Sequence, residues 1–250
     1  MGGVERVRLD DVTLAVQRIG AGTATPVIWG HGLSSSMESE DELGLLDWAV
    51  AAADRTVVRY DARSHGASER SAAPSDHTWD RLADYQLALA DRRGIDIYVA
   101  GGASMWGATA RFAALAAPER SERRVLAIPP TAWETRAAQT SVYETMAGLL
   151  EAGELDALLA GIDDAPVPDP FGADDRWKER SRERLLAADH DRLALVFRGA
   201  ALTDLPTPDD LRTIATPAVL LAWTGDSGHP VATAEALHDL LPDTQLHVAS

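Results

Sequence analysis

Val99-Ala100-Gly101-Gly102-Ala103-Ser104-Met105-Trp106-Gly107-Ala108 is the stretch that decides the fold of this chain. It passes from apolar residues through small ones to one hydroxyl and then into an alanine-rich segment. This order predicts a buried strand, a sharp turn at Ser104 and a helix. Such a turn strains its central residue and leaves room only for small neighbours, and Gly102 and Gly107 meet that demand. Ser104 is therefore a candidate nucleophile; the alternative is a simple packing joint between strand and helix.

The composition narrows the class of protein. A chain of 250 residues suits one α/β domain, with or without an inserted subdomain, and can bury a large apolar core. Cysteine is absent, which excludes disulfides, a thiolate nucleophile and thiolate metal ligands. The formal net charge of -16 disfavours binding to nucleic acid and to anionic membranes, although it also serves solubility. We expect a small-molecule substrate without net charge.

Targeting signals are not evident. The start, Met1-Gly2-Gly3-Val4-Glu5-Arg6, has no apolar signal core and lacks the Ser or Thr of a myristoylation signal. No later segment is long enough to span a bilayer. We therefore expect a cytoplasmic protein with no membrane partner, and the oligomeric state stays open.

Hydrophobic periodicity predicts the order of the elements. Residues 7–16 alternate about an Asp10-Asp11 turn, which predicts an antiparallel hairpin. Apolar runs without alternation predict buried strands, and segments with helical spacing separate them. The further strands are expected at 26–30, 56–60, 95–100, 125–128, 217–223 and 245–249, and helices at 40–53, 82–89 and 232–241. This alternation indicates the α/β class with a doubly wound, mostly parallel sheet.

The alternation of strands and helices stops between residues 131 and 214. This segment contains amphipathic helical patterns around 143–159 and 177–197, with no strand pattern between them. We expect residues 131–214 to form a helical lid. The core would then consist of residues 1–130 and 215–250.

Three stretches of the sequence resemble motifs of the α/β-hydrolase superfamily. The turn at Ser104 is similar to its nucleophile elbow, G-x-S-x-G, except that Trp106 replaces the last glycine. His31-Gly32-Leu33 resembles the family's HG-x loop. The stretch 61–68 resembles the D-x-R-x-H-G-x-S signature, with Ser64 in place of a glycine. The resemblance implies an α/β-hydrolase fold with an inserted helical lid, and it implies a structural role for the third motif.

The resemblance also implies an acyl-transfer hydrolase with no cofactor and no metal. Ser104 would attack a carbonyl carbon, and the backbone N–H groups of Leu33 and Met105 would form the oxyanion hole. A serine at the elbow disfavours the dehalogenases and epoxide hydrolases of this fold. Small, mostly apolar esters and lactones are the expected substrates. The candidate substrate-binding residues are His31, Gly32, Trp106 and Trp133.

The segment 223–230, Trp-Thr-Gly-Asp-Ser-Gly-His-Pro, resembles the acid loop of the family. It follows a predicted strand, and an aspartate there would hold an imidazole in the correct tautomer. Asp226 is therefore the candidate acid. The alternative is an aspartate that caps a turn before a helix.

The catalytic base is less evident. The family has its histidine in a loop after the final strand, whereas this sequence ends at Leu246-His247-Val248-Ala249-Ser250. A chain cut short is one explanation, and a replaced base is another. His247 is expected within a strand and His238 on a helix. His229, three residues beyond Asp226, is the remaining candidate.

Trp106 is expected either to narrow the site or to strain the turn, so that Trp106→Gly would stabilise the fold or widen the range of acyl groups. Together with the end of the sequence, it motivates an alternative function, a non-catalytic, receptor-like protein that binds a small apolar ligand. A further alternative is a lyase or pericyclase of the same fold, which would form no acyl-enzyme.

Overall fold

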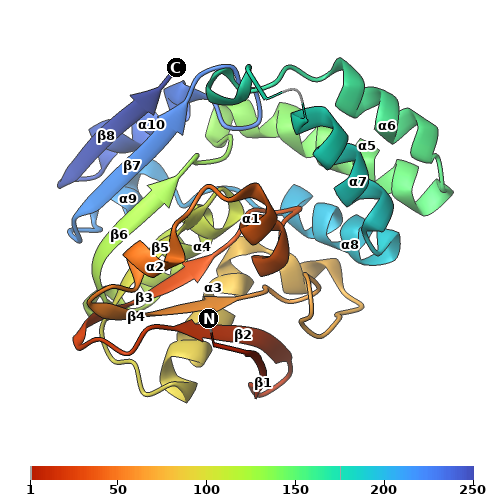
Figure 1. Ribbon diagram of the computed structural model, residues 1–250. Helices are drawn as coiled ribbons and strands as arrows, with labels where there is room; N and C mark the ends of the chain where they lie inside the picture. The colour runs from red at the N-terminus through yellow and green to blue at the C-terminus, as the bar shows by residue number, and fades with distance from the viewer. Residues whose placement is uncertain (1, 175) are drawn as a thin grey trace.

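The computed structural model describes residues 2–174 and 176–250, and a mixed eight-stranded sheet lies at its centre (Figure 1). The strand order is β1-β2-β4-β3-β5-β6-β7-β8. β1 (Val4–Arg8) and β2 (Thr13–Ile19) form an antiparallel hairpin, and β2 pairs antiparallel with β4. All other neighbours pair in parallel. The α/β class and the mostly parallel sheet predicted from the sequence are confirmed.

The remaining strands and the helices between them follow the predicted alternation. The strands are β3 (Ala24–Gly30), β4 (Arg55–Tyr60), β5 (Tyr98–Ala103), β6 (Ser121–Ala127), β7 (Ala218–Trp223) and β8 (Thr244–Ala249). The helices outside the segment 131–214 are α1 (Met37–Leu43), α2 (Trp48–Ala51), α3 (Trp79–Arg92), α4 (Met105–Ala116) and α10 (Val231–Leu240). In Figure 1, α1 and α2 lie in front of the sheet, and α3, α4 and α10 lie behind it.

Several boundaries differ from the prediction; β6, for example, begins at Ser121 and not at residue 125. The helix expected over 40–53 is interrupted, because Gly44 ends α1 in the left-handed region at φ 63°. Asp47 then caps a second helix by accepting two backbone N–H groups of its first turn. The strand expected at 95–100 begins later, at Tyr98, and continues to Ala103. It therefore carries the chain directly to Ser104.

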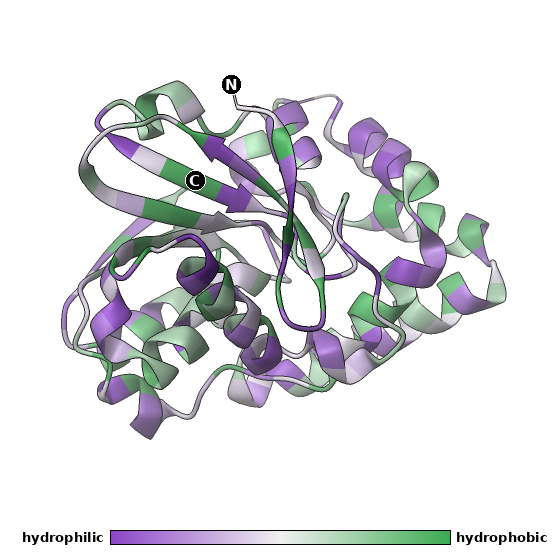
Figure 2. Cartoon of the chain, turned by 90° about the horizontal axis from the view of Figure 1, so that it is seen from below, coloured by the Kyte–Doolittle hydropathy of each residue, from purple (hydrophilic) through white to green (hydrophobic). Residues whose placement is uncertain are grey.

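The segment between β6 and β7 is helical in the part that the structure describes. It contains η3 (Trp133–Thr135), α5 (Arg136–Ala152), α6 (Leu155–Asp164), η4 (Asp169–Phe171), α7 (Trp177–Ala187), α8 (His190–Ala201) and α9 (Pro208–Arg212). Figure 1 shows α5 to α8 beyond the carboxyl ends of β6 and β7. Figure 2 shows hydrophilic and hydrophobic residues mixed along the helices, as expected for helices with one packed face. The role of this segment as a lid stays a prediction.

The main core lies between the sheet and helices α3 and α4. The residues on this face of the sheet include Ala100 and Gly102 of β5 and their register partners Arg124 and Leu126 of β6. α8 packs closely on η1 (Pro74–His77), since a Cβ on Gly199 would lie 2.4 Å from that of His77. Among the described helices, none is both long and apolar enough to cross a bilayer.

Candidate active site

The turn at Ser104 has the strained backbone that the sequence predicts. Ser104 has φ 52° and ψ −112°, in a region that residues other than glycine rarely adopt. It lies between the end of β5 and the start of α4, and its N–H donates to the Ala127 carbonyl of β6 at 2.9 Å. The hydroxyl therefore lies at the carboxyl edge of the sheet, where open α/β sheets place their ligand sites.

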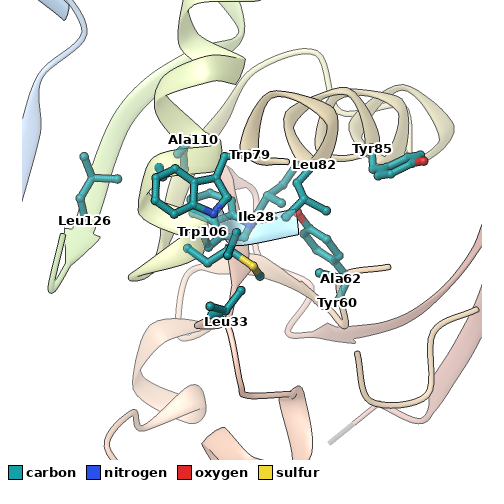
Figure 3. Close-up of a cluster of buried hydrophobic side chains, with 14 of the residues drawn as sticks. Ile28, Leu33, Tyr60, Ala62, Trp79, Leu82, Tyr85, Trp106, Ala110 and Leu126 are labelled. Carbon is teal, nitrogen blue, oxygen red and sulfur yellow. Dashed lines mark hydrogen bonds between the residues drawn. The ribbon is translucent and has the colours of Figure 1, made fainter. Parts of the chain in front are cut away.

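The structure corrects the expectation that Trp106 narrows the site. Its indole is only 1% exposed and packs in the core between α4 and the sheet, among the residues that Figure 3 labels. Gly30 and Gly102 are register partners on β3 and β5, and a Cβ on Gly30 would lie 1.4 Å from the indole Cδ1. The indole N–H also donates to the Tyr60 hydroxyl at 3.0 Å. Trp106 is thus a core residue, not a substrate-binding residue, and a glycine pair makes the space for it.

His229 lies between the other two candidate catalytic side chains. Its Nδ1 is 2.8 Å from Oδ2 of Asp226, and its Nε2 is 2.7 Å from Oγ of Ser104. An ionised carboxylate can only accept, so the Asp226 contact places the imidazole proton on Nδ1. Nε2 is then free to accept the hydroxyl proton of Ser104. The structure thus brings together three residues of which two, Ser104 and His229, are 125 positions apart.

The carboxylate of Asp226 is held by four donors from its own loop and the adjoining strand end. Oδ1 accepts the backbone N–H groups of Gly228 and His229 at 3.0 and 3.2 Å. Oδ2 accepts the indole N–H of Trp223 at 3.1 Å besides the imidazole N–H. Burial opposes ionisation of Asp226, but these hydrogen bonds and the electrostatic attraction to His229 outweigh it and hold its pKa below the usual value. Asp226 is therefore ionised at neutral pH.

The two candidate oxyanion donors belong to the residues that directly follow Ser104 and Gly32 in the sequence. Met105 is the first residue of α4, where backbone N–H groups have no partner within the helix. Leu33 follows Gly32, and a Cβ on Gly32 would lie 3.6 Å from that of Ser104. Within residues 2–174 and 176–250, neither the Leu33 nor the Met105 N–H donates to a protein acceptor. Both donors are thus available for a developing negative charge.

His31 supports this loop and is buried, which corrects its assignment as a substrate-binding residue. It is 1% exposed, and its Nε2 accepts the Ala62 N–H at 3.0 Å. Its Nδ1 must therefore carry the proton, which it donates to the Gly32 carbonyl at 2.8 Å. That carbonyl belongs to the same peptide group as the Leu33 N–H. Burial and the neighbouring His65 lower the pKa of His31 to about 3, so the ring stays neutral and keeps both bonds.

The stretch 61–68 has the structural role implied by the family resemblance. Oδ1 and Oδ2 of Asp61 accept the N–H groups of Met37 and Ala67 at 2.8 and 2.9 Å. Ser64, in place of a glycine, adopts a positive φ of 62°. Its hydroxyl lies 2.9 Å from Nε2 of His77, and this bond helps to hold the residue in an unfavourable conformation.

Trp133 marks the entry into the helical segment. Its backbone N–H contacts both carboxylate oxygens of Asp204, and its indole N–H donates to the Pro206 carbonyl at 3.1 Å. These bonds fasten the start of the segment to its end. A role for Trp133 in substrate binding stays a prediction, as does a role for Gly32.

A cavity of about 470 Å³ lies between the core and helices α7 and α8. Its core wall includes Ser34, directly after Leu33, and His65, whose Nε2 lies 2.6 Å from the Leu33 carbonyl. The opposite wall includes Arg184 and Val196. Ser104 does not line this cavity, so the cavity adjoins the oxyanion loop and not the nucleophile itself. Its walls are more polar than the sequence led us to expect.

Trp223 is a site residue that sequence reasoning missed. Its indole orients Asp226, and its ring packs edge-on against Phe171, with centroids 5.1 Å apart. Phe171 in turn stacks on Trp177 at 4.4 Å. The position of Trp223 at a strand end, three residues before an aspartate, was the available signal. In the described residues, no cluster of three or more histidine, aspartate or glutamate side chains is arranged to hold a metal.

Comparisons with known proteins identify the family. A model described as "Alpha/beta hydrolase family" matches residues 9–249. The chain belongs to the α/β hydrolase family. No curated protein shows significant sequence similarity to this α/β hydrolase.

Solved structures similar to this α/β hydrolase include three bacterial enzymes. A hydrolase from Pseudomonas aeruginosa PA01 is 25% identical, with a TM-score of 0.82 over 99% of this chain and 90% of that chain. The enol-lactonase from Burkholderia xenovorans LB400 is 20% identical, with a TM-score of 0.83 over 98% and 91%. A thermophilic esterase from Thermogutta terrifontis is 20% identical, with a TM-score of 0.77 over 99% and 90%. The last two similarities show the fold alone.

Proposed function

We propose that this α/β hydrolase cleaves a small ester or lactone through an acyl-enzyme formed on Ser104. The observation that carries the proposal is the continuous relay from Asp226 through His229 to Ser104, with contacts of 2.8 and 2.7 Å. A nucleophile, a base within hydrogen-bond reach and a group that orients the base are the parts that covalent acyl transfer requires. The lactonase and esterase among the similar structures support this substrate class.

The geometry supports a two-step mechanism. Ser104 Oγ attacks the carbonyl carbon while its proton passes to Nε2 of His229, and the N–H groups of Leu33 and Met105 stabilise the oxyanion. The imidazolium, stabilised by Asp226, gives the proton to the leaving alcohol, and an acyl-enzyme remains. Water then attacks the acyl carbon and gives a proton to Nε2. Ser104 leaves with that proton, and the acid is released.

Labelling with a fluorophosphonate probe tests the nucleophile. The protein should take up one probe per chain at Ser104, and Ser104→Ala should take up none while remaining folded. Mass spectrometry of the intact protein and of its peptides gives both numbers. A folded wild-type protein that stays unlabelled would instead favour a receptor-like ligand-binding protein.

Substitution of His229 tests the base. His229→Ala and His229→Gln should each lower the hydrolysis rate of an activated ester by about 10²–10⁴-fold, the usual contribution of a general base. In a rate profile measured between pH 5 and 9, the wild-type rate should fall on the acid side, because protonated Nε2 cannot accept from Ser104. This fall should be absent from the profiles of both variants. Wild-type rates in both variants would remove His229 from the mechanism.

A panel of esters and lactones would define the substrate. It should vary the acyl length and also the polarity of the alcohol, because the cavity beside Leu33 contains serine hydroxyls and the Arg184 guanidinium. A preference for polar alcohols would place that part of the substrate in the cavity. A preference for apolar ones would support the expectation from the sequence.

A further inference from the structure

The candidate acid and the candidate base belong to the same loop. Asp226 and His229 both lie in the acid loop, residues 223–230, whereas Ser104 lies at the elbow between β5 and α4. The 2.7 Å contact between Nε2 of His229 and Oγ of Ser104 therefore joins two separate parts of the chain. Whatever holds the acid loop in place also determines whether the base reaches the nucleophile.

The helical segment between β6 and β7 holds the acid loop through its backbone. The N–H of Asp169, the first residue of η4, donates to the Thr224 carbonyl at 3.0 Å, and the Thr131 N–H donates to the Gly228 carbonyl at 3.3 Å. A Cβ on Gly225 would lie 2.5 Å from Oδ1 of Asp169. Gly225, which has a φ of 78°, thus permits η4 to approach the loop closely.

Phe171 adds a contact between side chains. Its ring lies edge-on against the Trp223 indole, with centroids 5.1 Å apart and an angle of 88° between the planes. It also stacks on Trp177 at 4.4 Å, with 12° between the planes. The indole N–H of Trp223 donates at 3.1 Å to Oδ2 of Asp226, the same oxygen that lies 2.8 Å from Nδ1 of His229. A continuous series of contacts thus leads from the helical segment to the candidate base.

The orientation of the Trp223 indole is what makes this series effective. Its N–H points at Asp226 only while the ring keeps its orientation, and edge-to-face packing on Phe171 favours one relative orientation of the two rings. Phe171 is in turn stacked on Trp177, the first residue of α7. α7 also provides Arg184 to the wall of the cavity of about 470 Å³. A ligand in that cavity would therefore contact the helix that supports Phe171.

We propose that Phe171 is a positioning residue of the hydrolysis, acting through Trp223 to hold Asp226 and His229 against Ser104. This inference rests on the proposed function. Phe171 takes no part in proton transfer itself. A misplacement of about 1 Å can cost about 10²-fold in rate, so a residue that acts through others can still limit the reaction. The helical segment then contributes to catalysis as well as covering the sheet edge.

The rate at which a fluorophosphonate labels Ser104 tests the proposal without knowledge of the substrate. Phe171→Ala should lower the labelling rate constant by about 10–100-fold at neutral pH, because the base is misplaced. In a profile between pH 5 and 9, the acid-side fall should also move to lower pH, because the imidazolium loses part of its stabilisation by Asp226. A wild-type rate constant and profile in folded Phe171→Ala would overturn the proposal.

Three further variants separate positioning from simple stability. Phe171→Tyr keeps the ring and should restore the wild-type rate constant and profile. Leu202→Ala removes an apolar side chain from the same helical segment, but that residue is 64% exposed, and labelling should stay unchanged. Phe171→Leu keeps most of the apolar volume without a ring, and it replaces Phe171→Ala in every measurement if the alanine variant does not fold. An equal loss of rate in Leu202→Ala would overturn the specific role of Phe171.

Hydrogen exchange of the acid loop gives a measurement that does not depend on activity. The N–H groups of Gly228 and His229 donate to Asp226 and should exchange slowly in the wild-type protein. Mass spectrometry should show faster exchange of residues 224–230 in Phe171→Ala. Unchanged exchange there would overturn the proposal. Faster exchange, combined with a wild-type protein that is never labelled, would support the positioning by Phe171 and overturn the proposed function instead.

Discussion

At the scale of single residues, Trp106 shows how a motif can change without loss of the structure around it. The elbow motif has a glycine at this position because helix and strand approach closely. Here the space comes from the glycine pair Gly30 and Gly102, whose missing side chains leave room for the indole. The hydrogen bond to the Tyr60 hydroxyl then satisfies the buried indole N–H. The tryptophan therefore stabilises the core beneath Ser104.

Truncation of Trp106 should accordingly destabilise the protein. Trp106→Ala should lower the free energy of unfolding by about 3–5 kcal/mol, because it leaves a large cavity and an unpaired Tyr60 hydroxyl. Urea denaturation measures this loss. Trp106→Phe, which keeps an aromatic ring but lacks the N–H, is the control and should cost clearly less. Wild-type stability in Trp106→Ala would contradict the packing described above.

At the scale of elements, the loop between β3 and α1 is fixed by two histidines on opposite sides of Leu33. His31 donates to the carbonyl of the peptide that carries the Leu33 N–H, and the Ser35 N–H donates to the same oxygen at 3.1 Å. His65 contacts the Leu33 carbonyl on the following peptide. The loop thus holds its N–H in place before any substrate arrives, as oxyanion stabilisation requires.

Loss of His31 should impair the chemical step more than substrate binding. We expect His31→Ala to lower kcat by about 10–100-fold, somewhat less than the about 10²–10³-fold loss that follows removal of an oxyanion donor. KM should change little, because the His31 side chain is shut off from solvent. Steady-state kinetics on an activated ester separate the two constants. A rise in KM at unchanged kcat would assign His31 to substrate binding after all.

At the scale of the whole molecule, stability should depend on buried histidines. Burial and the neighbouring His65 lower the pKa of His31 to about 3 and that of His77 to about 4, against about 6.5 for an ordinary histidine. Between those values the unfolded chain binds protons that the native chain does not. The two neutral histidines therefore contribute fully to the free energy of unfolding above pH 6.5, and this contribution is lost as the pH falls toward 4. Glu40 opposes this trend, because burial raises its pKa to about 7.

The free energy of unfolding should consequently fall by about 3 kcal/mol between pH 7 and pH 4, as the two histidine contributions exceed that of Glu40. Urea unfolding at unit pH intervals measures this fall. In Glu40→Gln the fall should be steeper, because the opposing group no longer titrates. A stability that stays constant or rises toward pH 4 would contradict the neutral state of the two histidines.

The sequence by itself determined the alternation of elements and the positions of Ser104 and Asp226 at strand ends. These follow from local physical chemistry: apolar runs without alternation become buried strands, and a serine among small residues marks the tight turn. The interruption of the helix expected over 40–53 also has a local cause, since Gly44 ends α1. It was missed because hydrophobic spacing alone does not register a single glycine.

The tertiary structure decided the contacts between distant residues. His229 was one candidate base among several, and only the folding of the acid loop onto the elbow brings its Nε2 to Ser104. The burial of Trp106 depended on the register of β3 and β5, which sets two glycines side by side. Periodicity assigns a residue to a face of its element, but its neighbours are set by strand register and helix docking, which arise from the whole chain.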